Sequence, residues 1–369
     1  MAEKAVGVGL IGCGVISSIY LENARRFQEF EIVAVADLDR ARAEAQAAKF
    51  GVPRVCTVEE LLADPAVEIV LNLTVPKAHT EIGMAALAAG KHLYSEKPLT
   101  IERDDAAKLL ETARSRNLLV GSAPDTFLGG GLQTCRKLID DGAIGEPVAA
   151  TAFMFSSGPE SWHANPAFFY EYGGGPLLDM GPYYVTALVS LLGPVGRVTG
   201  AARASFSERT VGSEPLKGQK IPVTVPTHVV ATLDFESGAI ATLMTTFDVW
   251  YDEKSRFELY GAAGSLKVPD PNRFGGPVSL LKAGSSEWNT VELTHGSAEN
   301  SRGIGLADMA AALRGHRRHR ANGEVALHVL EVMHGILEAS ETGRHVDVAS
   351  RPKRPAPLPA GLADWAVDA

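Results

Sequence analysis

The sequence feature that most constrains the fold is a glycine turn close to the N-terminus, Gly9-Leu-Ile-Gly-Cys-Gly-Val-Ile-Ser17. The near-continuous apolar run 5–11 leads into it, which is typical of a strand covered on both faces. Apolar residues with helical spacing follow over 15–27. Gly12 permits a tight turn between the two, and Gly14 lets another group approach the backbone closely. The pattern predicts a strand–turn–helix unit of a parallel sheet.

The alternation of strands and helices continues through the first third of the chain. Further strands are expected at 32–36, 69–73, 92–95 and 118–121, with helices at 40–50, 80–89 and 103–116. Strands that alternate with helices of this length indicate a right-handed, doubly wound parallel sheet. We therefore expect an N-terminal Rossmann domain over residues 1–126.

After residue 126 the pattern changes to longer alternating segments, with turn pairs such as Ser237-Gly238 between them. Strands are expected at 148–155, 195–206, 227–235, 239–250 and 256–260, and helices at 132–140, 304–314 and 325–341. This pattern indicates a C-terminal α+β domain over 127–350 with a large, mostly antiparallel open sheet. The fold class is thus α/β, and the proline-rich tail 351–369 is expected to run irregularly over the surface.

The composition excludes several classes of partner. The 369 residues carry a formal net charge of −9, which argues against nucleic acid or an anionic membrane as the main partner. The one dense basic run, 314–320, is expected to be a solvated helix end and loop. Cys13, Cys56 and Cys135 show no metal-binding spacing, so we expect no metal site and a reduced cytoplasmic compartment. The sequence contains no apolar run of membrane-spanning length.

The glycine turn and a later acid together indicate dinucleotide binding. Backbone N–H groups around Val15 and Ile16, at the start of the helix, can bind phosphate groups, and Ser17 is small enough to replace a third glycine. Asp37 lies 20 residues beyond Ser17 at a strand end, where a carboxylate can bind both ribose hydroxyls and repel a 2′-phosphate. We therefore expect NAD, with NADP less favoured. The alternative is an ordinary strand–turn–helix junction with a solvated acid.

The chain resembles the glucose–fructose oxidoreductase / inositol dehydrogenase (Gfo/Idh/MocA) superfamily over nearly its whole length. The order and spacing of short motifs carry this resemblance: Gly12-Cys13-Gly14, Thr74-Val75-Pro76 with His79, Gly90-Lys91-His92, Glu96-Lys97-Pro98, Gly173-Gly174-Gly175, Asp179, and Gly323-Glu324-Val325-Ala326 leading to Gly343-Arg344. The resemblance implies an NAD-dependent oxidoreductase of a small sugar or polyol, assembled as a homodimer or homotetramer.

The resemblance also implies roles around the cofactor. Lys97 would lie between nicotinamide and substrate, at the carboxyl end of a parallel strand, where such sheets bind ligands. Glu96 would border the cofactor, and a surface lysine after a strand is the alternative for Lys97. The bond from Lys97 to Pro98 is open to the cis form. Three residues would line the path of the cofactor: Thr74, Pro76 and His79.

Oxidation of an alcohol requires a proton acceptor beside the hydride acceptor. Many relatives, including the inositol dehydrogenases, have an Asp followed four residues later by a His. Here Asp179 is followed at that offset by Tyr183, as in glucose–fructose oxidoreductase and the dimeric dihydrodiol dehydrogenases. A nearby Lys97 ammonium would lower the pKa of the phenol and make Tyr183 a feasible base, with Asp179 orienting the hydroxyl or the lysine. Pro182 must begin a helix or kink one. The alternatives are core packing of Tyr183 beside Tyr184 and a helix-capping role for Asp179.

Three further residues are candidates for substrate binding: Asp125, Trp162 and His163. Asp125 follows the expected strand 118–121, and the other two lie on a loop. An aromatic side chain with polar neighbours suits a sugar ring, whose C–H face stacks while its hydroxyls need hydrogen bonds. Loop packing is the alternative for all three.

These features predict an NAD-dependent dehydrogenase that oxidises a secondary hydroxyl of a sugar, anhydrosugar, polyol or cyclitol. The first alternative is an NAD(P)H-dependent keto- or anhydrosugar reductase. A nucleotide-binding regulator without turnover is the second, but we would expect such a protein to lose Lys97 or Asp179, and this chain retains both.

Overall fold

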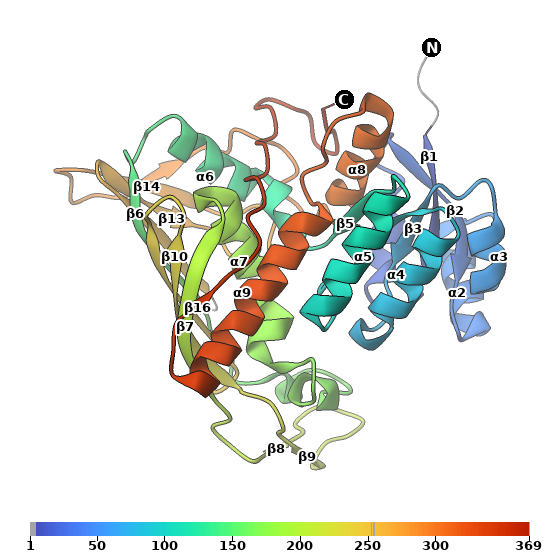
Figure 1. Ribbon diagram of the computed structural model, residues 1–369, viewed down its shortest axis with the longest axis horizontal. Coiled ribbons are helices and arrows are strands. Elements are labelled where there is room, and N and C mark those ends of the chain that lie inside the picture. The colour runs from blue at the N-terminus through green and yellow to red at the C-terminus, as the bar shows by residue number, and fades with distance from the viewer. Residues whose placement is uncertain (1–4, 252, 254, 369) are drawn as a thin grey trace. The chain divides into compact units, whose positions relative to one another are not determined.

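The computed structural model describes residues 5–251, 253 and 255–368, and the chain forms two compact units (Figure 1). The first unit contains the chain up to Gly129, together with His295–Leu327 and the segment from Leu358. The second unit contains Gly130–Thr294 and His328–Pro357. The division therefore differs from the continuous boundaries expected at residues 126 and 350, because two later segments pack with the first unit.

The first unit is built on a five-stranded sheet in the order β2-β1-β3-β4-β5. All its strand pairs are parallel, which confirms the doubly wound fold predicted from the sequence. Single bridges extend the sheet at both edges, from Val35 to Val55 and from Gly121 to Asn322. The strand order turns back between β1 and β3, where sheets of this kind bind ligands beyond the carboxyl ends of the strands. The strands are β1 (Val6–Ile11), β2 (Phe30–Ala36), β3 (Ile69–Asn72), β4 (His92–Ser95) and β5 (Val120–Ser122).

The helices of the first unit are α1 (Ser17–Asn23), α2 (Arg40–Phe50), α3 (Val58–Ala63), α4 (His79–Ala88), α5 (Arg103–Ser115) and α8 (Ile304–Gly315), with the short helices η1 (Pro76–Ala78) and η2 (Thr126–Leu128). Both ends of α2 are marked in the sequence, and its bounds match the prediction. Asp39 caps its first turn by accepting the N–H of Ala41, and Gly51 ends it at a φ of 66°. Helix α3 is not predicted from the sequence, although Thr57 and Glu60 form a capping box at its start.

Long-range contacts explain why the two later segments belong to the first unit. Helix α8 packs against β5. The ring of Trp365 meets Phe27 edge-on at a centroid distance of 5.4 Å, and a ring nitrogen of His295 lies 3.0 Å from the carbonyl oxygen of Leu358. Contacts between residues this far apart in sequence leave no trace in local hydrophobic periodicity.

The basic run 314–320, which is expected to be solvated, is exposed at Gly315, His316 and Arg318 but buried at its last two residues. Arg314 forms an ion pair with Glu68, and His319 is buried with Nε2 2.9 Å from the carbonyl oxygen of Val120. Arg320 is 5% exposed and lies against the buried carboxylate of Asp308. The buried residues are tolerated inside the unit because an acidic residue and a carbonyl oxygen pair with them.

The second unit is built on a nine-stranded sheet in the order β15-β14-β13-β12-β6-β11-β10-β7-β16. β6 and β11 pair in parallel and the other neighbours are antiparallel, which confirms the mostly antiparallel sheet. Its strands are β6 (Pro147–Met154), β7 (Val195–Arg203), β10 (His228–Phe235), β11 (Ile240–Thr246), β12 (Ser255–Gly261), β13 (Gly264–Val268), β14 (Val278–Lys282), β15 (Asn289–Val291) and β16 (Val346–Asp347). A separate hairpin, β8 (Glu208–Thr210) with β9 (Lys220–Pro222), is not predicted from the sequence.

Helices α6 (Gly130–Asp140) and α7 (Gly175–Leu192) pack against the strands of this sheet (Figure 1). The remaining helical segments are η3 (Pro159–Ser161), η4 (Ala167–Tyr170) and α9 (Gly323–Thr342), whose first residues belong to the first unit. The bounds of helix α7 are not predicted from the sequence, because from Gly181 onward its residues are buried and it shows no amphipathic period. Within the part of the chain that the structure describes, no helix is long and apolar enough to cross a membrane.

Candidate active site

The glycine turn between β1 and α1 lies at the point where the strand order turns back. Gly12 has a φ of 101°, and a Cβ added there would lie 2.6 Å from the carbonyl carbon of Leu73. Only glycine allows this approach of the chain that leaves β3. At Gly14 an added Cβ would meet no described atom within 4 Å, and the neighbouring Val15 is 97% exposed. The turn therefore presents an open cradle that a side chain at Gly14 would fill, and this fits the close approach of a dinucleotide.

Ser17 and Ile16 complete the turn. The hydroxyl of Ser17 is buried and donates to the carbonyl oxygen of Gly14 at 2.6 Å. Ile16 is half-buried at the N-cap position of α1, where no side-chain cap hydrogen bond is formed. Serine at the third fingerprint position thus fixes the turn by a hydrogen bond as well as fitting beside the strand.

Asp37 follows β2 and is held beside the turn. Its Oδ2 accepts the N–H of Cys13 at 2.6 Å, and its Oδ1 accepts the N–H of Asp39 at 2.8 Å. Each carboxylate oxygen keeps a further lone pair, so the group can also accept from a ligand hydroxyl. Burial and the Asp37 charge raise the pKa of the Cys13 thiol to about 12, which keeps the thiol neutral. The nearest following arginine, Arg40, pairs with Glu44 at 2.9 Å.

Thr74, Pro76 and His79 follow β3. Thr74 is half-buried and donates its hydroxyl to Asn72 at 2.7 Å, while Pro76 begins η1 and is also half-buried. His79 is 1% exposed, with Nδ1 2.6 Å from the carbonyl oxygen of Pro98 and Nε2 3.0 Å from that of Thr74. Burial lowers the pKa of its imidazole. His79 therefore joins the segments that follow β3 and β4 from inside the unit.

Glu96 and Lys97 follow β4. Glu96 Oε1 accepts the hydroxyl of Tyr20 at 2.9 Å, and Oε2 accepts the N–H of Lys97 at 3.0 Å. Burial raises the pKa of Tyr20 well above its ordinary value, so the phenol remains a donor. Lys97 is half-buried, and its bond to Pro98 is cis. The Glu96 side chain therefore holds the backbone at Lys97, just beyond the carboxyl end of β4.

Asp125 lies inside the first unit. It is 1% exposed, and its Oδ2 accepts the N–H groups of Gly303 and Gly305 at 2.9 and 3.0 Å. Burial raises the pKa of this carboxyl from 3.8 to about 6. The geometry places Asp125 as the cap of α8, which favours a structural role over contact with a substrate.

Asp179 and Tyr183 lie four residues apart on α7, and so share a face of that helix. The N-cap is Gly174, so Asp179 is not the capping residue, and Pro182 lies inside the helix. Asp179 is half-buried and Tyr183 is 7% exposed. The neighbouring Tyr184 is fully buried and stacks on another ring of the second unit.

Trp162 and His163 belong to an aromatic patch in the second unit, which consists of Trp162, His163, Phe168 and Phe169. The imidazole of His163 meets both phenylalanines edge-on, at centroid distances of 5.3 and 5.2 Å. Trp162 meets His163 edge-on at 5.4 Å and remains 66% exposed. The patch presents aromatic surface together with one polar ring.

Comparison with known proteins identifies the family. Residues 6–123 match the model of an oxidoreductase family with an NAD-binding Rossmann fold, and residues 132–267 match the GFO/IDH/MocA C-terminal domain. A dTDP-3,4-didehydro-2,6-dideoxy-alpha-D-glucose 3-reductase of Saccharopolyspora spinosa is 34% identical over 72% of this chain and 75% of its own. The chain belongs to the Gfo/Idh/MocA oxidoreductase family. Its first unit contains the NAD-binding Rossmann domain of that family.

Other relatives cover almost the whole of this Gfo/Idh/MocA protein. The 1,5-anhydro-D-fructose reductase of Ensifer adhaerens is 27% identical over 92% of this chain and 98% of its own. Levoglucosan dehydrogenase, solved as a complex with NADH and levoglucosan, has a TM-score of 0.80 at 21% identity and covers 94% of this chain and 99% of its own. The match to the solved structure shows the shared fold.

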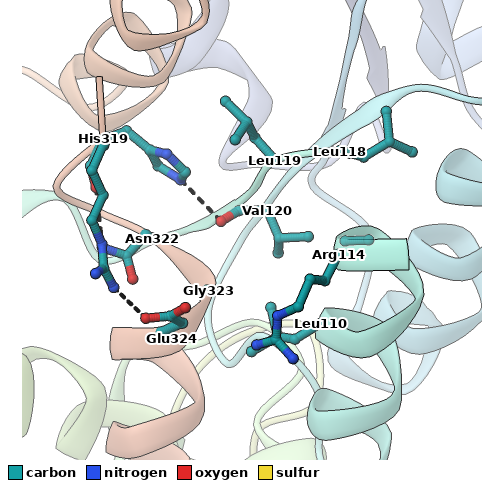
Figure 2. Close-up of a pocket in the computed structure, with 11 residues that line it drawn as sticks. Leu110, Arg114, Leu118, Leu119, Val120, His319, Asn322, Gly323 and Glu324 are labelled. Atoms are coloured by element: carbon teal, nitrogen blue, oxygen red, sulfur yellow. Dashed lines mark hydrogen bonds and ion pairs between the residues drawn. The ribbon is translucent and has the colours of Figure 1, made fainter. Parts of the chain in front are cut away.

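The first unit of this Gfo/Idh/MocA protein contains a cavity of about 310 Å³ (Figure 2). Its lining residues come from the second half of α5, the amino end of β5 with the two residues before it, the loop between α8 and α9, and the start of α9. The predicted cofactor residues lie at the opposite, carboxyl edge of the same parallel sheet, and none of them lines this cavity. Within the described residues, no group of three or more His, Cys, Asp or Glu side chains could hold a metal ion.

Sequence reasoning missed two residues that shape the cofactor edge. Tyr20 lies within the expected helical pattern, yet its hydroxyl holds Glu96. Asn72 is fully buried at the end of β3 and holds Thr74. A tyrosine on the covered face of a helix and an asparagine ending a buried strand are the available signals, because buried polar groups need partners.

Proposed function

We propose that the protein is an NAD-dependent dehydrogenase that oxidises a secondary hydroxyl of a sugar, anhydrosugar, polyol or cyclitol. The observation that carries the proposal is Lys97, which lies two residues beyond the end of β4 in an NAD-binding Rossmann unit and donates its backbone N–H to Glu96. The names of the relatives support a sugar substrate: an anhydrofructose reductase, a deoxysugar nucleotide reductase and levoglucosan dehydrogenase.

In this proposal, bound NAD supplies the hydride acceptor, and the three predicted catalytic residues act on the hydroxyl. Tyr183 accepts the hydroxyl proton on its phenolate oxygen. The Lys97 ammonium stabilises that phenolate and the oxygen that is losing its proton, because a nearby cation favours an anion. Asp179 orients the hydroxyl or the lysine from the same face of α7 as Tyr183.

The same groups would also serve the reverse reaction, the reduction of a keto- or anhydrosugar, with Tyr183 returning the proton. Two relatives that are named as reductases favour this direction as the second candidate function. Initial rates decide between the two. One set uses NAD with a panel of sugars and polyols, and the other uses NADH or NADPH with the corresponding keto-sugars, both followed by absorbance of the reduced nicotinamide.

Replacement of Lys97 tests the proposal at its central residue. Lys97→Ala should lower turnover by a factor on the order of 10²–10⁴, as for other acid–base groups, while the dissociation constant for NADH changes little. Lys108→Ala, at an exposed position of α5, is the matched control and should keep full turnover. Undiminished turnover in Lys97→Ala would contradict the assigned role.

A further inference from the structure

An arm of the second unit, residues 208–224, holds the segment that carries the aromatic patch. This arm contains the β8–β9 hairpin and the residues after it. At one end of the segment, Gly212 donates its N–H to the carbonyl oxygen of Glu160 at 2.8 Å, and Ser213 donates its hydroxyl to that of His163 at 2.6 Å. At the other end, Thr224 donates both its N–H and its hydroxyl to the carbonyl oxygen of Tyr170 at 3.0 Å. The segment 160–170 is thus fixed at both ends.

Arg209 is the centre of this arrangement. One guanidinium nitrogen lies 3.1 Å from Oε1 of Glu160, and another donates to the carbonyl oxygen of Phe247 at 2.9 Å and pairs with Asp248. The three charged side chains are only 12, 10 and 6% exposed for Arg209, Glu160 and Asp248. Tyr170 donates its hydroxyl to the second oxygen of Glu160. Arg209 therefore links the arm and the end of the sheet to the segment 160–170.

Two buried carboxylates paired with one guanidinium are expected to contribute little to the net stability of the fold. The desolvation of buried charges offsets much of their attraction, and apolar side chains of similar volume often stabilise a protein as well. The planar fork of arginine does provide fixed geometry, because it bridges two acceptors at once in a way that lysine does not. The charges are better explained by the position that they impose on segment 160–170 than by stability alone.

We propose that Arg209 is a positioning residue for substrate selection, which holds Trp162 and His163 so that they favour a cyclic sugar over an open-chain polyol. The inference rests on the proposed function. A ring presents a flat C–H face that can stack on the exposed indole of Trp162, and His163 offers a hydrogen-bonding group beside it. An open chain lacks such a face and gains little from a fixed aromatic ring. Arg209 acts on this selection through Glu160 and the backbone of segment 160–170.

The test compares Arg209→Gln, Arg209→Lys and Trp162→Ala, in the full-length protein, on a cyclic sugar and an open-chain polyol. Arg209→Gln should raise the KM for the cyclic sugar about tenfold or more, with kcat changed less than threefold and the NADH dissociation constant unchanged. Arg209→Lys should not restore the KM. Trp162→Ala, at an exposed position, should give the same loss of preference without a lower melting temperature. In the double variant the two losses should not add, because both act through one contact.

Arg197→Gln is the matched control, since Arg197 forms a half-exposed ion pair with Asp234 in the same unit. It should leave the preference for the cyclic sugar unchanged. Equal effects of Arg209→Gln on both substrate classes, full rescue by lysine, or additive losses in the double variant would overturn the inference.

A second measurement separates the inference from the proposed function: hydrogen exchange of segment 160–170 should accelerate in Arg209→Gln and not in Arg197→Gln. Absence of any turnover by the wild-type protein would contradict the proposed function, whereas unchanged exchange would contradict the positioning role.

Discussion

Asp37 serves the fold and the proposed cofactor preference with the same two oxygens. It holds the N–H groups of Cys13 and Asp39, and it places a negative charge beside the glycine turn. Asp37→Asn keeps an acceptor for Cys13 but removes the charge that would repel a 2′-phosphate. We expect the KM for NAD to rise about tenfold, the effect of one lost charge-assisted hydrogen bond, and the rate with NADP to increase.

Steady-state rates with both cofactors check this prediction. Asp39→Asn is the control, because Asp39 caps α2 and lies two residues after Asp37 in the chain. An unchanged ratio of kcat/KM for NADP over NAD in Asp37→Asn would assign the preference to other residues.

Tyr183→Phe removes the proposed proton acceptor and leaves the ring in place. Turnover should fall on the order of 10²–10⁴-fold, and the limb of the pH–rate profile that reports the acceptor should move. Tyr172→Phe, at an exposed position of the same unit, should change neither. A reduced rate with an unmoved profile would transfer the proton role to another group.

At the scale of elements, capping residues explain which helices can be read from the sequence. Asp39 and Gly51 mark both ends of α2, and its bounds agree with the prediction. The start of α8 is different, because its cap is Asp125, which lies far away in the chain. Sequence spacing cannot reveal a cap of this kind, and for that reason Asp125 looks like a candidate for substrate binding when only the sequence is read.

The burial of Asp125 makes a prediction about pH. Burial raises the pKa of its carboxyl from 3.8 to about 6, so the folded protein holds this proton more tightly than the unfolded chain. The contribution of this proton to the free energy of unfolding is therefore fully present below the unfolded pKa, and it is lost as the pH rises through about 6. Asp125→Asn keeps an oxygen for Gly303 and Gly305 without a charge. Relative to wild type, its free energy of unfolding should increase between about pH 4 and about pH 7, by on the order of 2–3 kcal/mol.

Denaturant unfolding of both proteins across this pH range measures the difference. Asp104→Asn, at an exposed acid of α5, should show a difference that hardly changes with pH. If the difference in the free energy of unfolding between Asp125→Asn and wild type is also independent of pH, then ionisation of the buried carboxyl does not destabilise the fold.

At the scale of the whole molecule, local sequence patterns predict both sheets but not the way in which the chain is divided between the units. The alternation of strands and helices around β1 to β5 predicts a parallel sheet, and the glycine turn with Asp37 predicts which edge of that sheet binds the cofactor. The polar contacts that hold this edge, such as Tyr20 with Glu96, join residues 76 positions apart and have no local signature. The same is true of the two C-terminal segments that complete the first unit.

The last of these segments leads to a prediction about the NAD-binding unit. Within the segment from Leu358 onward, Asp368 accepts from Arg320 at 2.9 Å, and Trp365 packs on Phe27. Asp308, which is fully buried, would be left facing two guanidinium groups, those of Arg317 and Arg320, if the segment were removed. Deletion of 358–369 should therefore lower the melting temperature of the first unit by several degrees, since each kcal/mol lost corresponds to roughly 2–4 °C for a unit of this size. Thermal unfolding with and without NADH identifies the transition of this unit, because a ligand stabilises the part that binds it.

The control is Glu299→Gln, which removes an exposed ion pair with Arg26 and should leave the melting temperature of that transition unchanged. An unchanged NADH-dependent transition after the deletion would show that the first unit is complete without its C-terminal segment.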